Sequence, residues 1–128
     1  MDSHSVLFSF SGTVKKHLRR GTELGYPTAN IEVKPETPEG IFVGLAHIEN
    51  KRYPSLVFVG KALTFDEDDK KAEIFILDFD SDIYGKILNV EVHKKLRDNQ
   101  KFNTSEALVQ QIKKDELQAR DFFSTMKE

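Results

Sequence analysis

Short apolar runs, separated by residues that favour turns, occupy most of the chain up to residue 97. In the first run, apolar residues and Gly12 alternate with serine and threonine from Val6 to Val14, which is the period of a strand with one buried face. Five more segments have strand-like patterns: residues 28–33, Ile41 to Ile48, Tyr53 to Val59, Ala72 to Phe79 and Lys86 to Leu96. The short loops between them predict six antiparallel strands.

The remaining residues change to a helical period. Asn103-Thr-Ser-Glu106 is typical of a helix N-terminus, with Asn103 at the N-cap and the acidic residue at N3. Apolar residues follow at helical spacing: Leu108, Ile112, Ala119 and Phe122. We therefore expect a single domain, residues 1–128, in which a barrel over about 5–97 is closed by a helix over about 104–123. A β-sandwich is the open alternative.

Composition limits the functions available to the chain. Its 128 residues suffice for one domain with its own core, and a net charge of −2 argues against a general nucleic-acid or membrane surface. There is no cysteine, no secretory signal and no apolar run long enough to cross a bilayer. We expect a cytoplasmic monomer without nucleic-acid or membrane partners. The P-loop and dinucleotide-binding glycine patterns are absent.

A basic segment punctuated by glycine runs from Gly12 to Asn30. Glycine lets backbone N–H groups approach an anion. Four cations add positive charge: Lys15, Lys16, Arg19 and Arg20. Pro27 favours an extended exit, after which Thr28 and Asn30 offer a hydroxyl and an amide oxygen, both suited to Mg²⁺ beside phosphate. Composition alone favours the alternative, a basic surface loop with local turn bonds.

One carboxylate falls on an apolar side of a predicted strand. Glu73 shares this side with Phe75, Leu77 and Phe79. An unpaired carboxylate is costly to bury, so Glu73 either marks the frayed start of the strand or is held there for use. A base at the mouth of a barrel, beside a phosphate-binding loop, could accept the proton of a hydroxyl that attacks a phosphoryl group.

Four segments, in order along nearly the whole chain, resemble the riboflavin kinase family. They are Leu24-Gly-Tyr-Pro-Thr-Ala-Asn30 after Arg20-Gly21, Pro38-Glu-Gly-Ile-Phe42, Glu73-Ile-Phe-Ile-Leu-Asp-Phe-Asp-Ser-Asp-Ile-Tyr-Gly85, and Leu96-Arg-Asp-Asn-Gln-Lys-Phe102. The resemblance implies a six-stranded antiparallel Greek-key β-barrel closed by the C-terminal α-helix. It also implies a Mg²⁺-dependent enzyme that transfers the γ-phosphoryl group of ATP to the 5′-hydroxyl of riboflavin to give FMN.

The same resemblance implies roles for single residues. Glu73 is the expected catalytic base, and Thr28 and Asn30 are the expected metal ligands. The expected nucleotide contacts are Gly12, His17, Gly21, Thr28, Asn30, Ile76, Asp78 and Tyr84. The expected flavin contacts are Arg97, Gln100 and Phe102. The implied partners are therefore riboflavin or FMN and ATP or ADP.

Two other functions stay open at this point. His17 stands where the family usually has glycine, and no basic residue directly precedes Leu24, so a catalytically impaired flavin- or nucleotide-binding module of the same fold is one alternative. A small barrel that binds single-stranded nucleic acid is another, disfavoured by the acidic net charge. Family members often carry an FMN adenylyltransferase domain, so the chain is either a stand-alone kinase or one domain of a longer protein.

Overall fold

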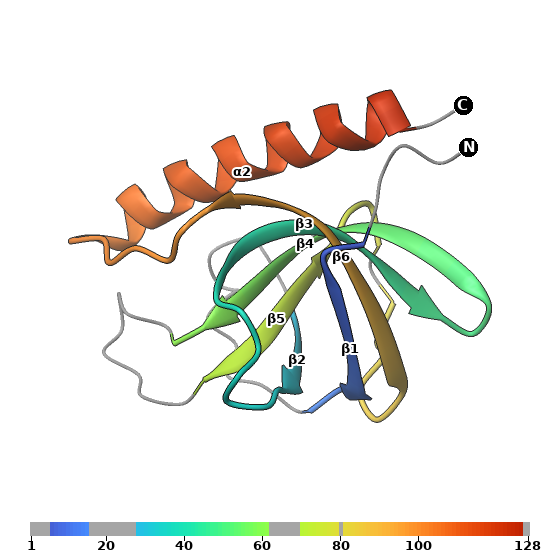
Figure 1. The fold of residues 1–128 in the computed structure, drawn as a ribbon. Helices are drawn as coiled ribbons and strands as arrows, with labels where there is room; N and C mark the ends of the chain where they lie inside the picture. The colour runs from blue at the N-terminus through green and yellow to red at the C-terminus, as the bar shows by residue number, and fades with distance from the viewer. Residues whose placement is uncertain (1–5, 16–27, 62–69, 80, 127–128) are drawn as a thin grey trace.

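A computed structural model describes residues 6–15, 28–61, 70–79 and 81–126 of the chain (Figure 1). The regular elements are β1 (Phe8–Thr13), β2 (Ala29–Glu32), β3 (Gly40–Ile48), β4 (Lys51–Gly60), β5 (Lys71–Ile76), β6 (Ile87–Arg97) and α2 (Ser105–Met126). The predicted six strands and C-terminal helix are confirmed. No helix within these ranges is long and apolar enough to cross a membrane.

The six strands form one strongly curved antiparallel sheet in the order β1-β6-β3-β4-β5-β2. The two edge strands, β1 and β2, approach each other, and the N–H of Lys15 donates to the backbone oxygen of Asn30 at 2.8 Å. This contact nearly closes the sheet into a barrel, as Figure 1 shows. The predicted barrel is therefore confirmed, and the sandwich alternative is wrong.

Gly12 lies where β1 passes closest to β2. A Cβ added to Gly12 would lie 2.6 Å from Cγ2 of Ile31, a separation that real Cβ atoms do not tolerate. Glycine at this position therefore lets the two edge strands come together. The sequence associated Gly12 with a nucleotide, whereas the structure adds a packing reason for the same residue.

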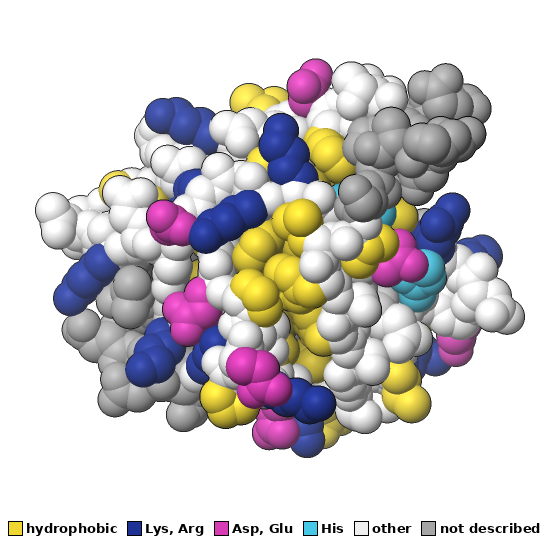
Figure 2. Space-filling view, in the orientation of Figure 1, with side chains coloured by type: hydrophobic (Ala, Val, Ile, Leu, Met, Phe, Trp, Pro, Cys, Tyr) yellow, Lys and Arg dark blue, Asp and Glu magenta, His cyan; other side chains and the backbone are white. Residues whose placement is uncertain are grey.

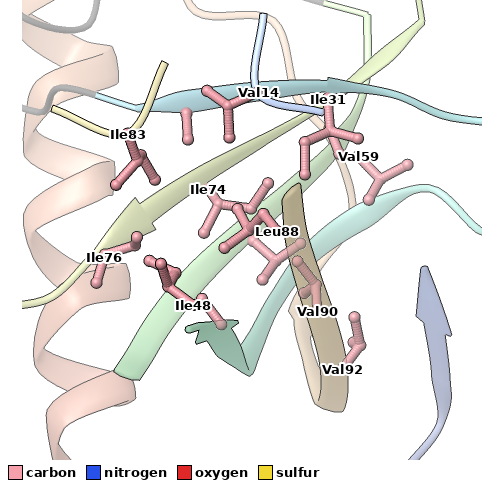
Figure 3. Close-up of a cluster of buried hydrophobic side chains, with 14 of the residues drawn as sticks. Val14, Ile31, Ile48, Val59, Ile74, Ile76, Ile83, Leu88, Val90 and Val92 are labelled. Atoms are coloured by element: carbon pink, nitrogen blue, oxygen red, sulfur yellow. The ribbon is translucent and has the colours of Figure 1, made fainter. Parts of the chain in front are cut away.

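The barrel interior is filled by aliphatic side chains that alternate with outward-facing residues. Figure 3 shows ten of them: Val14, Ile31, Ile48, Val59, Ile74, Ile76, Ile83, Leu88, Val90 and Val92. Each is at most 8% exposed. Since burying such a side chain stabilises the fold by about 1.5–3 kcal/mol, this cluster is the main source of barrel stability. On the outer surface, in the same orientation as Figure 1, further hydrophobic side chains gather near the centre of the visible face, with charged side chains around them (Figure 2).

Helix α2 lies across one outer side of the barrel (Figure 1). A second apolar cluster fills this contact, formed by Ile41, Val43, Leu56, Leu77 and Ala119 with several half-buried aromatic side chains around them. The helix begins one residue later than predicted. Thr104 is its N-cap, because its Oγ1 accepts a hydrogen bond from the N–H of Ala107 at 3.0 Å and its backbone oxygen accepts one from Leu108.

Strand β5 ends at Ile76, three residues before the predicted end at Phe79. The chain turns at Asp78, which has a φ of 56°, a conformation incompatible with a continuing strand. Leu77 consequently packs in the cluster beneath α2, whereas Phe79 packs against Tyr53 and the barrel interior. The alternation had predicted that Glu73 and Phe79 share one side of the strand, and this prediction is wrong.

Candidate functional site

Glu73 projects from the outer side of β5, towards the same side as Phe75. Its neighbours Ala72 and Ile74 point into the barrel and are at most 1% exposed. In the antiparallel pairing Glu73 faces Asn30 on β2 and Phe58 on β4. The Glu73 side chain is 25% exposed, so the carboxylate is partly sheltered and still reachable. The sheet thus fixes its position from both flanking strands.

A hydroxyl and a cation contact the two carboxylate oxygens of Glu73. Oγ1 of Thr28 donates a hydrogen bond to Oε1 at 3.2 Å, across 45 residues of sequence. Nζ of Lys71 lies 3.8 Å from Oε2. The structure thus brings together Thr28 and Glu73, which the sequence assigned to one site, and adds Lys71. The period-two alternation could have indicated that Lys71 lies beside Glu73, because residues 71 and 73 share a strand face.

Asn30 completes this group from the neighbouring strand. Its backbone oxygen is used in the barrel closure with Lys15, and the residue is only 7% exposed. The side-chain oxygen Oδ1 is buried and has no hydrogen-bond partner among the described residues. Buried polar atoms are nearly always satisfied, so this oxygen, on the residue that pairs with Glu73, is a candidate ligand-binding atom. An amide oxygen in this state suits a hard cation such as Mg²⁺.

The described residues contain no group of three His, Cys, Asp or Glu side chains placed to hold a metal ion. A metal here would depend on oxygen atoms of other residue types together with those of its substrate. Thr28 and Asn30 provide one hydroxyl and one amide oxygen of this kind. Because Mg²⁺ is often held by few protein ligands together with substrate phosphates, this donor set fits it.

Backbone hydrogen bonds link the turn that carries Tyr84 to the barrel seam at Asn30. The N–H of Gly85 donates to the backbone oxygen of Val14 at 3.0 Å, and the next residue, Lys15, bonds Asn30. Tyr84 itself is 61% exposed, and its backbone N–H donates to Oδ1 of Asp82. An aromatic ring is therefore presented to solvent on the turn that adjoins the end of the barrel seam.

Two further predicted nucleotide contacts lie in different surroundings. Ile76 is 6% exposed and belongs to the barrel interior. Asp78 is on the surface and makes a bidentate ion pair with Arg120 of α2, with oxygen–nitrogen distances of 3.0 and 3.1 Å. The hydrogen bonds from Arg120 lower the pKa of Asp78 from its ordinary value. His17 and Gly21, also predicted to contact the nucleotide, lie outside the described residues.

On the predicted flavin side, Arg97 is engaged with helix α2. Its Nε and Nη2 atoms donate to both carboxylate oxygens of Asp115 at 2.8–3.1 Å. Gln111 donates to the same carboxylate at 3.0 Å, and Nη1 of Arg97 donates to the backbone oxygen of Asp98. The Asp115 side chain is 3% exposed. This buried pair was not predicted, since nothing in the sequence pattern links residues 97 and 115.

The segment after β6 brings the other predicted flavin residues towards β5. Nδ2 of Asn99 donates to the backbone oxygen of Lys61 at 2.8 Å, beside Gly60, which is the pairing partner of Lys71. Gln100 is exposed, and Phe102 lies under the Arg97 guanidinium, 5.8 Å from its carbon to the ring centroid. Arg97, Gln100 and Phe102 therefore lie on one short segment, which reaches Lys61 through Asn99.

The fold defines a class, the small antiparallel barrels of six strands with a helix across one side. The profile of one family in this class, Flavokinase or riboflavin kinase, matches residues 5–123. The chain therefore belongs to the riboflavin kinase family, as its motifs predicted. A crystal structure of riboflavin kinase from Trypanosoma brucei shares the fold with a TM-score of 0.65 and 24% identity, covering 91% of this chain and 76% of that one.

Two curated proteins show the similarity in sequence. The trifunctional protein RibF/MnmA of Mycoplasmoides gallisepticum is 40% identical over 119 residues, which are 91% of this chain and 18% of that protein. The RNA-binding riboflavin kinase RibR of Bacillus subtilis is 35% identical over 107 residues, 82% of this chain and 46% of that protein. The chain thus spans less than half the length of either relative.

Proposed function

We propose that this chain is a riboflavin kinase, which transfers the γ-phosphoryl group of ATP to the 5′-hydroxyl of riboflavin and releases FMN and ADP. The observation that carries the proposal is that the Thr28 hydroxyl bonds Glu73 on β5, while Asn30, whose amide oxygen has no partner among the described residues, faces Glu73 from β2. This arrangement combines a proton acceptor with hard oxygen ligands. Membership of the riboflavin kinase family supports the same reaction.

In the proposed reaction, a carboxylate oxygen of Glu73 accepts the proton of the riboflavin 5′-hydroxyl. The hydroxyl oxygen forms a bond to the γ-phosphorus, and the bond from that phosphorus to the β–γ bridging oxygen breaks, so that ADP leaves. Glu73 then returns the proton to water. The hydrogen bond from Thr28 keeps the carboxylate aimed, which matters because phosphoryl transfer depends mostly on positioning and charge neutralisation.

Thr28 Oγ1 and Asn30 Oδ1 are the proposed ligands of Mg²⁺, which when bound supplies positive charge against the phosphate oxygens. The burial of Oδ1 and its lack of a partner among the described residues support this assignment. The proposed nucleotide contacts are Tyr84, whose exposed ring is available for stacking, Gly12 at the barrel seam, and Asp78, with Ile76 acting through its backbone. For His17 and Gly21 the nucleotide role rests on the sequence.

The flavin is proposed to lie against the outer side of β5, between Glu73 and the segment that follows β6. Phe58 pairs with Glu73 across the sheet, and Phe75 follows two residues along the same face, so aromatic side chains flank the carboxylate. Phe102 and Gln100 approach from the other side. An isoalloxazine ring is large and aromatic and suits such walls. Arg97 would order this segment in addition to its predicted flavin contact.

The test is FMN formation from riboflavin, ATP and Mg²⁺, followed by chromatography. We expect FMN from the wild type and a loss of turnover of roughly 10²–10⁴-fold in Glu73→Gln, the usual contribution of a general base. Glu36→Gln, which removes an exposed carboxylate in the loop before β3, is the matched control. Riboflavin binding without FMN would favour the impaired module, and full turnover by Glu73→Gln would remove Glu73 as the base.

The partner predictions can be checked beside this assay. The name of one relative includes RNA binding, whereas this chain has a net charge of −2, so we keep the prediction that it has no nucleic-acid partner. A mobility-shift titration with single-stranded RNA at low salt checks it. Sedimentation of the chain with and without FMN checks the predicted monomer, and a cytoplasmic location is retained as a prediction from the sequence.

A further inference from the structure

The carboxylate of Glu73 has two oxygens, and only one is accounted for by Thr28. The second, Oε2, lies 3.8 Å from Nζ of Lys71. Both side chains are largely sheltered, with 23% of Lys71 and 25% of Glu73 exposed. Such an ammonium group is screened less than a surface lysine would be, so its effect on the neighbouring carboxylate is not lost to solvent.

The position of Lys71 is set by the sheet. It precedes Glu73 by two residues on β5 and therefore shares its outer face. Its pairing partners are Glu32 on β2 and Gly60 on β4. Positions on a strand held from both sides are more precise than positions on a loop, which is what a group beside reacting atoms requires.

Lys71 also lies on the side of Glu73 that faces the segment after β6. Gly60, its partner, has a φ of 150°, and a Cβ there would lie 3.2 Å from Nδ2 of Asn99. The same Asn99 nitrogen donates to the backbone oxygen of Lys61. Lys71 is thus placed between the proposed base and the segment that carries Gln100 and Phe102. In the proposed function, the acceptor hydroxyl approaches Glu73 from this side.

From these contacts we propose that Lys71 is a positioning residue for phosphoryl transfer, whose ammonium group attracts Oε2 of Glu73 from 3.8 Å while Thr28 holds Oε1 by a hydrogen bond. The inference rests on the proposed function. The two contacts together favour one orientation of the carboxylate towards the acceptor hydroxyl, and the ammonium adds a positive charge from the barrel wall. No role was predicted for Lys71 from the sequence.

The experiment compares Lys71→Met, Lys71→Arg and the matched control Lys94→Met, which removes an exposed lysine of β6. We expect Lys71→Met to lower kcat by up to about 100-fold, the effect of a misplaced catalytic group, with little change in the KM for ATP. Lys71→Arg should recover most of the turnover, and Lys94→Met should match the wild type. Lys71→Gln replaces Lys71→Met if the latter is unstable.

A double-mutant comparison separates positioning from a general structural role. In a Glu73→Gln background, Lys71→Met should cost little further activity, because its effect acts through the carboxylate. Wild-type turnover by Lys71→Met, or the same loss in both backgrounds, would overturn the inference while leaving the kinase assignment intact. Failure of the wild type to form FMN would instead overturn both.

Discussion

Two carboxylates, Glu73 and Asp115, show how differently this small fold uses the same chemical group. Asp115, on α2, accepts hydrogen bonds from Nε and Nη2 of Arg97 and from Gln111, and its side chain is 3% exposed. Glu73, on β5, accepts one hydrogen bond from Thr28, has Lys71 nearby, and is 25% exposed. The satisfied carboxylate fixes the helix to the barrel. The partly satisfied one has lone pairs left for a substrate.

The neighbours of the two carboxylates differ in the same way. Next to Asp115, Gln111 adds a second donor, and Nε, Nη1 and Nη2 of Arg97 each donate at least one hydrogen bond. Next to Glu73, the buried oxygen of Asn30 has no partner among the described residues. Polar groups whose hydrogen bonds are all made stabilise the fold. Polar groups with hydrogen bonds left unmade can bind a ligand, but they lower the stability of the fold. The comparison predicts opposite outcomes for substitutions in the two regions.

The largest effect on stability is expected at the α2 contact. Asp115→Ala leaves the Arg97 guanidinium without its partner, and breaking a buried pair typically costs about 3–5 kcal/mol. Urea unfolding followed by circular dichroism measures it. Glu116→Ala, which removes a half-buried carboxylate one residue along the same helix, is the control and should cost much less. Equal losses in the two variants would contradict the structural role assigned to Asp115.

A smaller effect, of opposite sign for stability, is expected in the other region. Asn30→Leu removes a buried oxygen that has no described partner and keeps a similar volume, so the free energy of unfolding should stay equal or rise. The Mg²⁺ concentration needed for half-maximal FMN formation should increase by about 10-fold or more. A marked loss of stability with unchanged Mg²⁺ dependence would show that Asn30 is structural.

The N-cap of α2 tests a local contact within the helix. Thr104→Ala removes the hydroxyl that accepts from Ala107, and it should destabilise the fold by about 1 kcal/mol. Thr125→Ala is the matched control, because its hydroxyl only donates to the backbone oxygen of Phe122 and satisfies no free N–H. Thermal unfolding of both variants checks the difference, and a null result for Thr104 would return the cap to Asn103 as first predicted.

The smallest effect concerns the exposed ion pair of Asp78 with Arg120. Because the folded state lowers the pKa of Asp78 below 3.8, the pair stabilises the fold above that pH and loses its contribution as the pH falls through the lowered value. Asp78→Asn should therefore differ slightly from the wild type near neutral pH and converge with it in acid. A difference that keeps its neutral-pH size well below the lowered pKa, or grows there, would contradict this explanation.

Local periodicity was sufficient for the strands and the helix, but it left a sandwich open beside the barrel that the family resemblance implied. It misplaced the end of β5, because a period-two pattern does not show where the backbone turns, as it does at Asp78 with a φ of 56°. The sequence singled out Thr28, Asn30 and Glu73 from their residue types and from family motifs, and the structure places Thr28 and Asn30 beside Glu73, while their roles stay predictions. It could not predict the Arg97–Asp115 pair or the Lys71–Glu73 contact in detail, because side-chain partners depend on three-dimensional packing.

We infer that Glu73 acts in the proposed phosphoryl transfer, whereas Asp115 holds α2 against the barrel. The most direct test measures FMN formation and the free energy of unfolding on two isosteric variants, Glu73→Gln and Asp115→Asn. We expect Glu73→Gln to lose turnover by roughly 10²–10⁴-fold with little change in unfolding free energy, whereas Asp115→Asn should lose mainly stability. Full turnover by Glu73→Gln, or a loss of stability as large as that of Asp115→Asn, would contradict this inference.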